Sequence, residues 1–315
     1  MDDILAKTVR RACVTGGAGF IGSRVVRGLL ERDIEVLVID NLSVGRRENV
    51  LSPAVLLEAD ILDSGVFDEI ASCDVVFHLA ARVAIRSSFE FVVEDSTANV
   101  VGTANVLRGA AKSGSRVKKF VLASSMAVYA DSVDPKPITE EYELQPESPY
   151  GVSKLAAEML VRQMCQESGI DSATLRLFNT YGSGQALSPY VGVVTIFANA
   201  MREGRAPSIF GDGEQRRDFI HVEDVALGFI NAMLHRTDGQ VFNIGSGTGL
   251  TVNEVYREVA RALGFYQTPI YAAAVPGELR NSIADNTRAR KTINFQPQHS
   301  FANSIASVLG GSGGV

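Results

Sequence analysis

Short apolar segments alternate with amphipathic segments through the first 177 residues of the chain. The apolar segments are rich in β-branched residues and have the length of buried strands in a parallel sheet. We expect strands at 11–15, 35–39, 55–58, 74–79 and 119–123, with helices between them. This alternation predicts an α/β fold with a doubly wound parallel sheet, in which ligands lie beyond the carboxyl ends of the strands.

A glycine-rich loop follows the first predicted strand. Its glycines at 16, 19 and 22 lead into a helix predicted at 21–31, so a pyrophosphate could approach the backbone at the amino end of that helix. Asp40 follows the second predicted strand, where a carboxylate can accept hydrogen bonds from the adenosine ribose. Because a carboxylate repels a 2′-phosphate, we expect NAD rather than NADP. We interpret the neighbouring Arg46 and Arg47 as a solvated pair.

A second group of polar residues follows the strand predicted at 119–123, which leads into two serines, the second being Ser125. After Pro149 the apolar residues recur at helical spacing, so Tyr150 and Lys154 are expected one turn apart on one face. A tyrosine titrates near ~10. An ammonium one turn away is expected to lower that pKa, so that the tyrosine can act as a base while Ser125 shares a proton with a substrate oxygen.

The composition narrows the possible functions. The net charge of −6 argues against binding of nucleic acid or of anionic membranes. The first ten residues lack an apolar core and no window reaches membrane-spanning length, so we expect a cytoplasmic protein without a signal peptide. We expect Cys13, Cys73 and Cys165 to be small buried apolar residues, and we expect no metal site.

The motifs resemble those of the extended short-chain dehydrogenase/reductases that act on nucleotide sugars, the NAD-dependent epimerase/dehydratase family. The resemblance runs from residue 15 to about residue 297 and is closest to UDP-glucose 4-epimerases and related NDP-sugar epimerases. The segments that carry it are 15–22, 78–81, 124–125, 150–154, 176–182 and 217–219.

The resemblance implies a domain organisation. Residues 1–179 would form an NAD-binding Rossmann domain, and residues 180–309 mainly a smaller α/β domain that binds the nucleotide sugar, with some chain crossing back to the sheet. Residues 310–315 are expected to be a flexible tail. The expected cofactor is NAD, the expected substrate is a UDP-sugar or dTDP-sugar, and a homodimer is expected through the helices after Ser87 and Tyr150.

The resemblance also implies site residues. Tyr150 would take the proton of the sugar 4-hydroxyl while C4 gives hydride to NAD, Ser125 would bind the same oxygen, and Lys154 would hold the nicotinamide ribose. Asn99 resembles a buried structural asparagine of the family, and His78 is expected to be packed rather than catalytic. Cofactor contacts are expected at Gly16, Gly19, Phe20, Ile21, Gly22, Asp40, Asn41, Asp60, Ile61, Leu79, Ala80, Ala81, Asn99, Tyr150, Lys154 and Phe178, and substrate contacts at Ser125, Met126, Asn179, Val194, Arg217, Glu278 and Arg280.

Two positions narrow the expected reaction. The 4,6-dehydratases of the family have an Asp and a Glu directly after the catalytic hydroxyl, where this chain has Met126 and Ala127. Dehydration, decarboxylation and uronate chemistry are therefore disfavoured. We expect 4-epimerisation of a UDP-hexose, and the alternatives are a dTDP-6-deoxyhexose 4-epimerase, an NDP-4-ketosugar reductase and a non-catalytic nucleotide sensor. The small Ser282 would leave room for an N-acetyl group on the sugar.

Overall fold

Seven parallel strands form the central sheet of the computed structural model, which describes residues 9–83, 87–132, 136–185, 192–274 and 280–310. Their order is β10–β6–β5–β4–β1–β2–β3, so the direction of winding reverses between β1 and β4. Ligands of doubly wound sheets bind at such a reversal. The strands are β1 (Arg11–Thr15), β2 (Glu35–Asp40), β3 (Val55–Glu58), β4 (Val75–His78), β5 (Lys119–Ser125), β6 (Asp171–Leu177) and β10 (Val241–Ile244).

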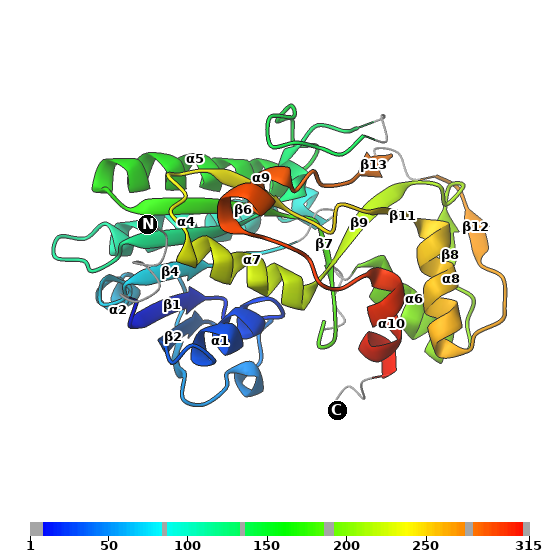
Figure 1. The fold of residues 1–315 in the computed structure, drawn as a ribbon, viewed down its shortest axis with the longest axis horizontal. Coiled ribbons are helices and arrows are strands. Elements are labelled where there is room, and N and C mark those ends of the chain that lie inside the picture. Colours follow the sequence, from blue (N-terminus) through cyan, green and yellow to red (C-terminus); the bar gives the residue numbers. More distant parts are fainter. Residues whose placement is uncertain (1–8, 84–86, 133–135, 186–191, 275–279, 311–315) are drawn as a thin grey trace.

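Helices cover both faces of this sheet, which confirms the predicted fold class (Figure 1). On one face, α1 (Gly22–Leu30), α7 (Val222–Leu234) and α9 (Thr287–Ile293) share an apolar core with Val14 and Val38. On the other face, α2 (Phe67–Ala71), α4 (Gly102–Ala110) and α5 (Pro149–Ser168) share a core with Leu37. Because both faces are covered, β2 and β4 carry consecutive apolar residues, at 36–39 and 75–77, instead of an alternating pattern.

A smaller α/β unit follows β6 and lies at the right of Figure 1. The chain leaves it after β9, runs through α7 and returns to the large sheet as β10. Its helices α6 (Val193–Arg202), α8 (Val252–Leu263) and α10 (Phe301–Gly310) pack around Phe197 and Val255. Its main sheet contains β7 (Asn179–Tyr181), β9 (Arg216–His221), β11 (Gly249–Thr251) and β13 (Asn281–Ser282), while β8 (Ser208–Phe210) pairs with β12 (Ile270–Ala272).

The helix that we predicted after the fourth strand is interrupted in the structure. It consists of α3 (Val92–Ser96), a π-helical turn at Thr97–Val101, and α4. A π turn widens one turn of a helix and thereby changes the direction of the side chains around it. This turn contains the buried Asn99, whose contacts belong to the site described below.

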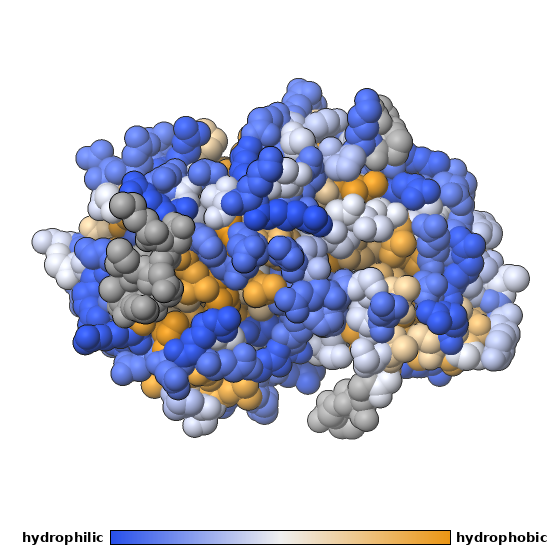
Figure 2. Space-filling model, viewed as in Figure 1, coloured by the Kyte–Doolittle hydropathy of each residue, from blue (hydrophilic) through white to orange (hydrophobic). Residues whose placement is uncertain are grey.

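The polarity of the surface and the burial of the cysteines are those expected from the composition. The face shown in Figure 2 is mostly hydrophilic, with apolar residues in patches between the polar ones. Cys13, Cys73 and Cys165 are free and buried, as expected. Among the helices of the described ranges, none combines the length and the apolar character that a membrane span requires.

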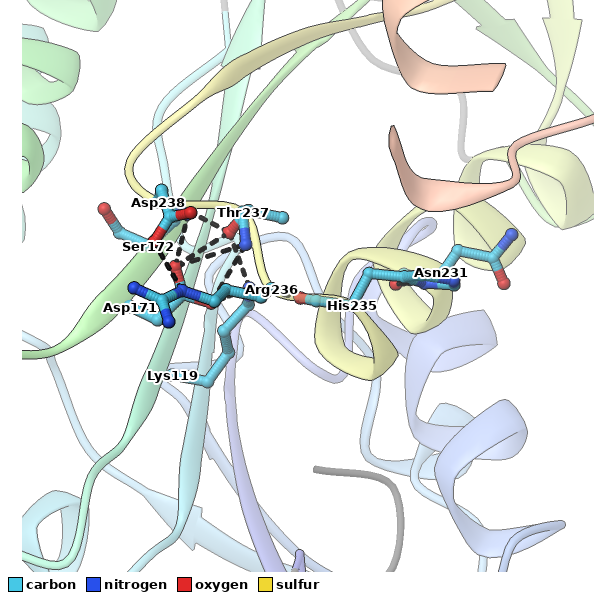
Figure 3. Close-up of polar contacts among 8 residues, drawn as sticks. All are labelled: Lys119, Asp171, Ser172, Asn231, His235, Arg236, Thr237 and Asp238. Atoms are coloured by element: carbon cyan, nitrogen blue, oxygen red, sulfur yellow. Dashed lines mark hydrogen bonds and ion pairs between the residues drawn. The ribbon is translucent and has the colours of Figure 1, made fainter. Parts of the chain in front are cut away.

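A buried lysine ties the amino ends of β5 and β6 to the loop between α7 and β10 (Figure 3). Lys119 Nζ donates to Asp171 Oδ2 at 2.7 Å, to the His235 carbonyl oxygen at 2.9 Å and to Thr237 Oγ1 at 2.6 Å. Burial lowers the pKa of Lys119, and the Asp171 carboxylate opposes that shift. All three N–H donors of the ammonium have acceptors. The network therefore stabilises the sheet at the amino ends of its strands, opposite to the carboxyl ends.

Candidate active site

Glycines shape the loop between β1 and α1. Gly16 has a φ of +71°, and a Cβ atom there would lie 2.7 Å from the backbone nitrogen of Ala80, just after β4. A Cβ atom on Gly22 would lie 2.2 Å from the Gly16 carbonyl oxygen, to which Gly19 N donates at 3.1 Å. The loop therefore folds tightly across the carboxyl ends of β1 and β4 and places the amino end of α1 beside them. Phe20 and Ile21 complete this loop, and Leu79, Ala80 and Ala81 continue β4 next to it.

Asp40 ends β2 beside this loop. Its Oδ2 accepts the Ala18 N–H at 3.0 Å, and its Oδ1 accepts the Leu42 N–H at 2.9 Å. Each carboxylate oxygen has two lone pairs, so the group keeps acceptor capacity for two further hydroxyls. The backbone thus orients a carboxylate at the position where the sequence predicted a contact with ribose.

The ends of β2 and β3 are joined by polar side chains. Asn41 Nδ2 donates to Asp60 Oδ2 at 2.8 Å. The next residue, Ile61, is buried against Gly102, where a Cβ atom would lie 2.5 Å from its side chain. Arg47 forms an exposed ion pair with Glu58, in agreement with our interpretation of a solvated arginine there.

His78, at the end of β4, belongs to a chain of hydrogen bonds. Its Nε2 contacts Thr103 Oγ1 at 2.9 Å, and Thr103 donates its own proton to the Asn99 carbonyl oxygen at 2.6 Å. Nε2 is therefore the donor, and Nδ1 accepts from Thr15 Oγ1 at 2.7 Å. Burial lowers the pKa of His78 to about 3, and the Lys154 ammonium adds to that shift. His78 is neutral and both its nitrogens are used, as expected of a packed histidine.

Asn99 fixes the segment that follows β4. Its Oδ1 accepts the Arg82 N–H at 2.8 Å, and its Nδ2 donates to the Arg82 carbonyl oxygen at 3.0 Å and to Ser153 Oγ at 2.9 Å. Ser153 donates in turn to the Tyr150 carbonyl oxygen at 2.8 Å. Asn99 thus joins the backbone after β4 to the first turn of α5. Both amide donors are used, so its direct contact with a cofactor stays a prediction.

The amino end of α5 lies against the segment that follows β5. Ser148 caps the helix by accepting the Gly151 N–H at 3.1 Å, and Pro149 occupies the first turn. A Cβ atom on Gly151 would lie 2.2 Å from the Ala127 carbonyl oxygen. Only a glycine allows this approach, and the sequence analysis did not identify it.

The three predicted catalytic residues meet at this contact. Ser125 ends β5 with its Oγ accepting the Ala127 N–H at 3.2 Å, and its hydroxyl lies near enough to Tyr150 to lower the pKa of that phenol. Tyr150 and Lys154 are both only 5% exposed and lie one turn apart on α5. The serine at the carboxyl end of β5 therefore lies beside the first turns of α5, which carry the tyrosine and the lysine.

Burial dominates the electrostatics of this group. It raises the pKa of Tyr150 to about 12; the neighbouring Ser125 hydroxyl opposes that rise, and the Asp95 carboxylate on α3 adds to it. Burial also lowers the pKa of Lys154 to about 8, against the raising effect of Glu158. Our expectation of a lowered Tyr150 pKa is therefore wrong for the chain without ligand, because the cost of burying a phenolate outweighs the lowering effect of Ser125.

Asn179 and Arg217 lie on neighbouring strands of the smaller unit, β7 and β9. Asn179 Nδ2 donates to the Asp218 carbonyl oxygen at 3.2 Å, and Arg217 Nη1 donates to the Arg216 carbonyl oxygen at 2.9 Å. Both side chains are half-buried. Their contact with a substrate stays a prediction.

Met126 and Phe178 belong to one apolar cluster between the two units. Met126 Sδ accepts from Ser282 Oγ at 3.2 Å, so the buried Ser282 lies directly behind the methionine. The residue that we expected to make room for an N-acetyl group is thus a neighbour of Met126. Whether the sugar reaches it stays a prediction.

Three further residues were predicted to contact the substrate: Val194, Glu278 and Arg280. Val194 is buried in the core of the smaller unit, so its contact with a ligand stays a prediction. Arg280 forms an exposed bidentate pair with Asp212, at 2.9 and 3.1 Å, and lowers the pKa of Asp212 to about 2. Glu278 lies outside the described residues. In the described part of the chain, no group of three or more His, Cys, Asp and Glu side chains could hold a metal ion.

The sequence analysis missed the roles of two acidic residues. Asp218 is buried and accepts four hydrogen bonds, from residues 246–247 and from Ala284, which tie β9 to the loop after β10 and to the segment after β13. Glu158 lies on the face of α5 that carries Lys154 and binds an arginine of β6. Its spacing of four residues from Lys154 is the one sequence signal that points to it.

Comparison with known proteins extends over both units. The model of the NAD dependent epimerase/dehydratase family matches residues 12–245. A UDP-glucose 4-epimerase from Mycolicibacterium smegmatis is 36% identical over 306 residues, which are 95% of this chain and 97% of that protein. The solved structure of a UDP-glucose 4-epimerase from Thermotoga maritima with UDP-glucose is 36% identical, with a TM-score of 0.90, and covers 95% of this chain and 97% of its own.

A second solved structure is that of a UDP-glucose 4-epimerase from Thermus thermophilus in complex with NAD. It is 33% identical to this chain, with a TM-score of 0.87, and the match covers 95% of this chain and 98% of that one.

Proposed function

The chain belongs to the NAD-dependent epimerase/dehydratase family of extended short-chain dehydrogenase/reductases, and on this premise we propose that it 4-epimerises a UDP-hexose of the UDP-glucose and UDP-galactose type. The observation that carries the proposal is that β5 ends in Ser125 beside the amino end of α5, on which the buried Tyr150 and Lys154 lie one turn apart. These are the groups that a reversible proton transfer at a sugar hydroxyl requires.

The cofactor is NAD, and the loop after β1 fits it. The contacts at Gly16 and Gly22 leave backbone rather than side chains at the amino end of α1, where a pyrophosphate is stabilised. Asp40 has the acceptor capacity for the two adenosine ribose hydroxyls. When bound, NAD would accept hydride from C4 of the sugar and return it to the opposite face.

Tyr150 would take the proton of the 4-hydroxyl and later return it to the oxygen of the 4-keto sugar. With a pKa of about 12 in the chain without ligand, it starts as a neutral phenol. Ser125 would hydrogen-bond to the same sugar oxygen, and the Lys154 ammonium is the nearby positive charge that the chain supplies to the phenolate. Asn179 and Arg217 would hold the diphosphate, so that the sugar ring can turn over while the nucleotide stays bound.

The residues beside Ser125 favour epimerisation over dehydration. Removal of water across C5 and C6 needs an acid and a base next to the sugar. Met126 and Ala127 supply neither, and Met126 lies in an apolar cluster. A dTDP-6-deoxyhexose 4-epimerase and an NDP-4-ketosugar reductase would use the same catalytic residues, and these are the alternatives.

The test is NMR of the purified protein, without added NAD, mixed in turn with UDP-galactose, UDP-N-acetylgalactosamine and a dTDP-6-deoxyhexose. We expect the C4 epimer of a UDP-hexose to form at a rate that the Tyr150→Phe variant does not reach. Turnover of the dTDP-sugar alone would replace the substrate that we propose. Reduction of a 4-keto sugar that requires added NADH or NADPH would instead identify a reductase.

We infer in addition that the chain forms a homodimer through α3 and α5. Both helices expose apolar side chains: Val93 on α3, and Val152 and Met159 on α5, with exposed fractions of 69%, 55% and 64%. An open surface groove of about 420 Å³ is lined by Val92 of α3, Pro146 and Val152 of α5, among others. A second copy of the chain would cover this apolar surface, and its removal from water favours association.

A further inference from the structure

Glu158 occupies the third turn of α5. Tyr150, Lys154 and Glu158 follow one another at intervals of four residues and therefore share one face of the helix. The side chain is buried, with 6% of its surface exposed. Its Oε1 accepts the Ser124 hydroxyl and Arg176 Nε, the latter at 3.0 Å, and its Oε2 accepts Arg176 Nη2 at 2.7 Å. The carboxylate is therefore bound by a bidentate guanidinium and a hydroxyl.

The two partners of Glu158 come from the two central strands that carry the site. Ser124 on β5 and Arg176 on β6 are register partners in the sheet. Ser124 directly precedes Ser125, and Arg176 comes three residues before Asn179. The bonds of Glu158 thus attach α5 to both strands at their carboxyl ends.

The arginine is itself held in place. Its guanidinium lies 4.7 Å from the centroid of the Tyr129 ring, and its Nη1 donates to the Glu140 carbonyl oxygen at 3.3 Å. Tyr129 donates to Asn243 Oδ1 on β10 at 2.6 Å. The anchor for α5 therefore extends across β6 to the edge of the large sheet, so a shift of Glu158 along the helix axis would break several bonds together.

We propose that Glu158 is a positioning residue for the reaction: its bonds to Ser124 and Arg176 hold α5 at the level that puts Tyr150 against Ser125, and its charge lies one turn from the Lys154 ammonium. The inference rests on the proposed function, because it assumes that Tyr150 and Lys154 do the chemistry. It adds a residue that touches neither substrate nor cofactor.

The charged groups around Lys154 determine how the loss of the Glu158 carboxylate would change the pKa of Lys154. On its own helix Lys154 has Glu158 and Tyr150 as titratable neighbours, His78 faces it from β4 as a neutral group, and Arg176 of β6 lies beyond the Glu158 carboxylate. In Glu158→Gln the Arg176 cation loses its counterion beside a second buried cation. The ammonium of Lys154 would then lose its proton at a lower pH.

The experiment compares the pH dependence of wild type, Glu158→Gln and Asp171→Asn. Asp171 is a matched control, because its buried pair with Lys119 joins the same two strands at their opposite ends. We expect the alkaline limb of the kcat profile to move down by about one pH unit in Glu158→Gln, with kcat about tenfold lower on the alkaline side of both limbs and KM nearly unchanged. Asp171→Asn is expected to lower the melting temperature and leave the profile in place.

A second measurement does not depend on turnover. Calorimetric titration with NAD, on protein freed of bound nucleotide, between pH 6.5 and 9.5 is expected to show affinity falling as Lys154 loses its charge, at a lower pH in Glu158→Gln than in wild type. Ser124→Ala, which removes the hydroxyl bond and keeps the ion pair, is expected to lower kcat with an unmoved pH profile. It also keeps the proposal testable if Glu158→Gln does not fold.

The outcomes separate the two proposals. Wild type that epimerises a UDP-hexose, together with pH profiles that coincide in wild type and Glu158→Gln and a normal kcat in Ser124→Ala, would overturn the role of Glu158 and leave the function intact. Wild type without epimerase activity would overturn the function, and the NAD titration would still decide whether Glu158 sets the charge of Lys154.

Discussion

The carbonyl oxygen of Gly16 lies 2.2 Å from the point where a Cβ atom of Gly22 would be. The contact closes the turn between β1 and α1, and a side chain at residue 22 would push the amino end of α1 away from the sheet. The arrangement of the whole cofactor loop therefore depends on the absence of one methyl group.

Gly22→Ala is expected to lower the free energy of unfolding by about 1–3 kcal/mol, because overpacking a tight contact costs about that much. It should also weaken NAD binding, since the loop must shift. Urea unfolding and calorimetric titration with NAD measure both effects. Gly65→Ala is the control, because a Cβ atom there would meet nothing within 4 Å. Equal behaviour of the two variants would contradict the prediction.

Tyr150→Phe is expected to reduce kcat by about 10²–10⁴-fold, the usual contribution of a general acid–base group. NAD affinity should change little, since the ring and its packing remain. The control is Tyr142→Phe, which removes a hydroxyl that donates to the Asp131 carbonyl oxygen at 3.1 Å on the surface. An active Tyr150→Phe enzyme would refute the assignment of the base.

Asp40→Asn is expected to weaken NAD binding by about 10–100-fold, because hydrogen bonds to a charged group contribute about 1.5–3 kcal/mol. The preference for NAD over NADP should also shrink, since the negative charge that repels a 2′-phosphate is gone. Calorimetric titrations with both dinucleotides measure the change. Glu31→Gln, beyond the far end of α1, is the control, and a preference that Asp40→Asn leaves unaltered would argue against a ribose contact.

His78 is expected to make the protein less stable in acid. Its pKa of about 3 in the folded chain lies below the ordinary value of 6.5, so the unfolded chain binds the proton more readily between these values. Stability from this group is complete above pH 6.5 and is lost as the pH falls, by about 3 kcal/mol at pH 4. Urea unfolding of wild type and His78→Gln at pH 7, 5.5 and 4 tests this. Parallel stability curves of the two proteins would exclude the effect.

Met159→Glu is expected to convert the proposed homodimer into a monomer, because it buries a charge in the apolar contact between copies of α5. Light scattering after gel filtration measures the mass of wild type and variant at equal concentration. Tyr266→Glu is the control, since Tyr266 is 94% exposed on the smaller unit. Elution of the wild-type protein as a monomer would contradict the inferred homodimer.

Local signals in the sequence predicted the large sheet, the glycine loop and the face of α5. Strands at 11–15 and 55–58 have the predicted bounds, because a short, mainly apolar run between turn residues depends mostly on its near neighbours. Tyr150 and Lys154 lie on one buried face because helical spacing is fixed by backbone geometry. These features need no knowledge of distant contacts.

Other features depend on residues that are far apart in the sequence. The approach of Gly151 to Ala127, the pair of Arg280 with Asp212 and the four bonds to Asp218 form only when the chain has folded. The direction of the Tyr150 pKa shift was predicted wrongly for the same reason, since spacing reveals the neighbouring charge and not the depth of burial. The π turn around Asn99 likewise has no signal in its own segment.

β10 joins the large sheet only late in the synthesis of the chain. This strand pairs with β6 along Val241–Ile244, so during translation the edge of β6 stays without its neighbour until residue 244 has left the ribosome. An open strand edge offers unpaired N–H and C=O groups to other chains. A nascent chain halted at residue 180 would expose that unpaired strand edge without α7 packed on the sheet, and would be prone to aggregate. The same holds for a recombinant fragment 1–180.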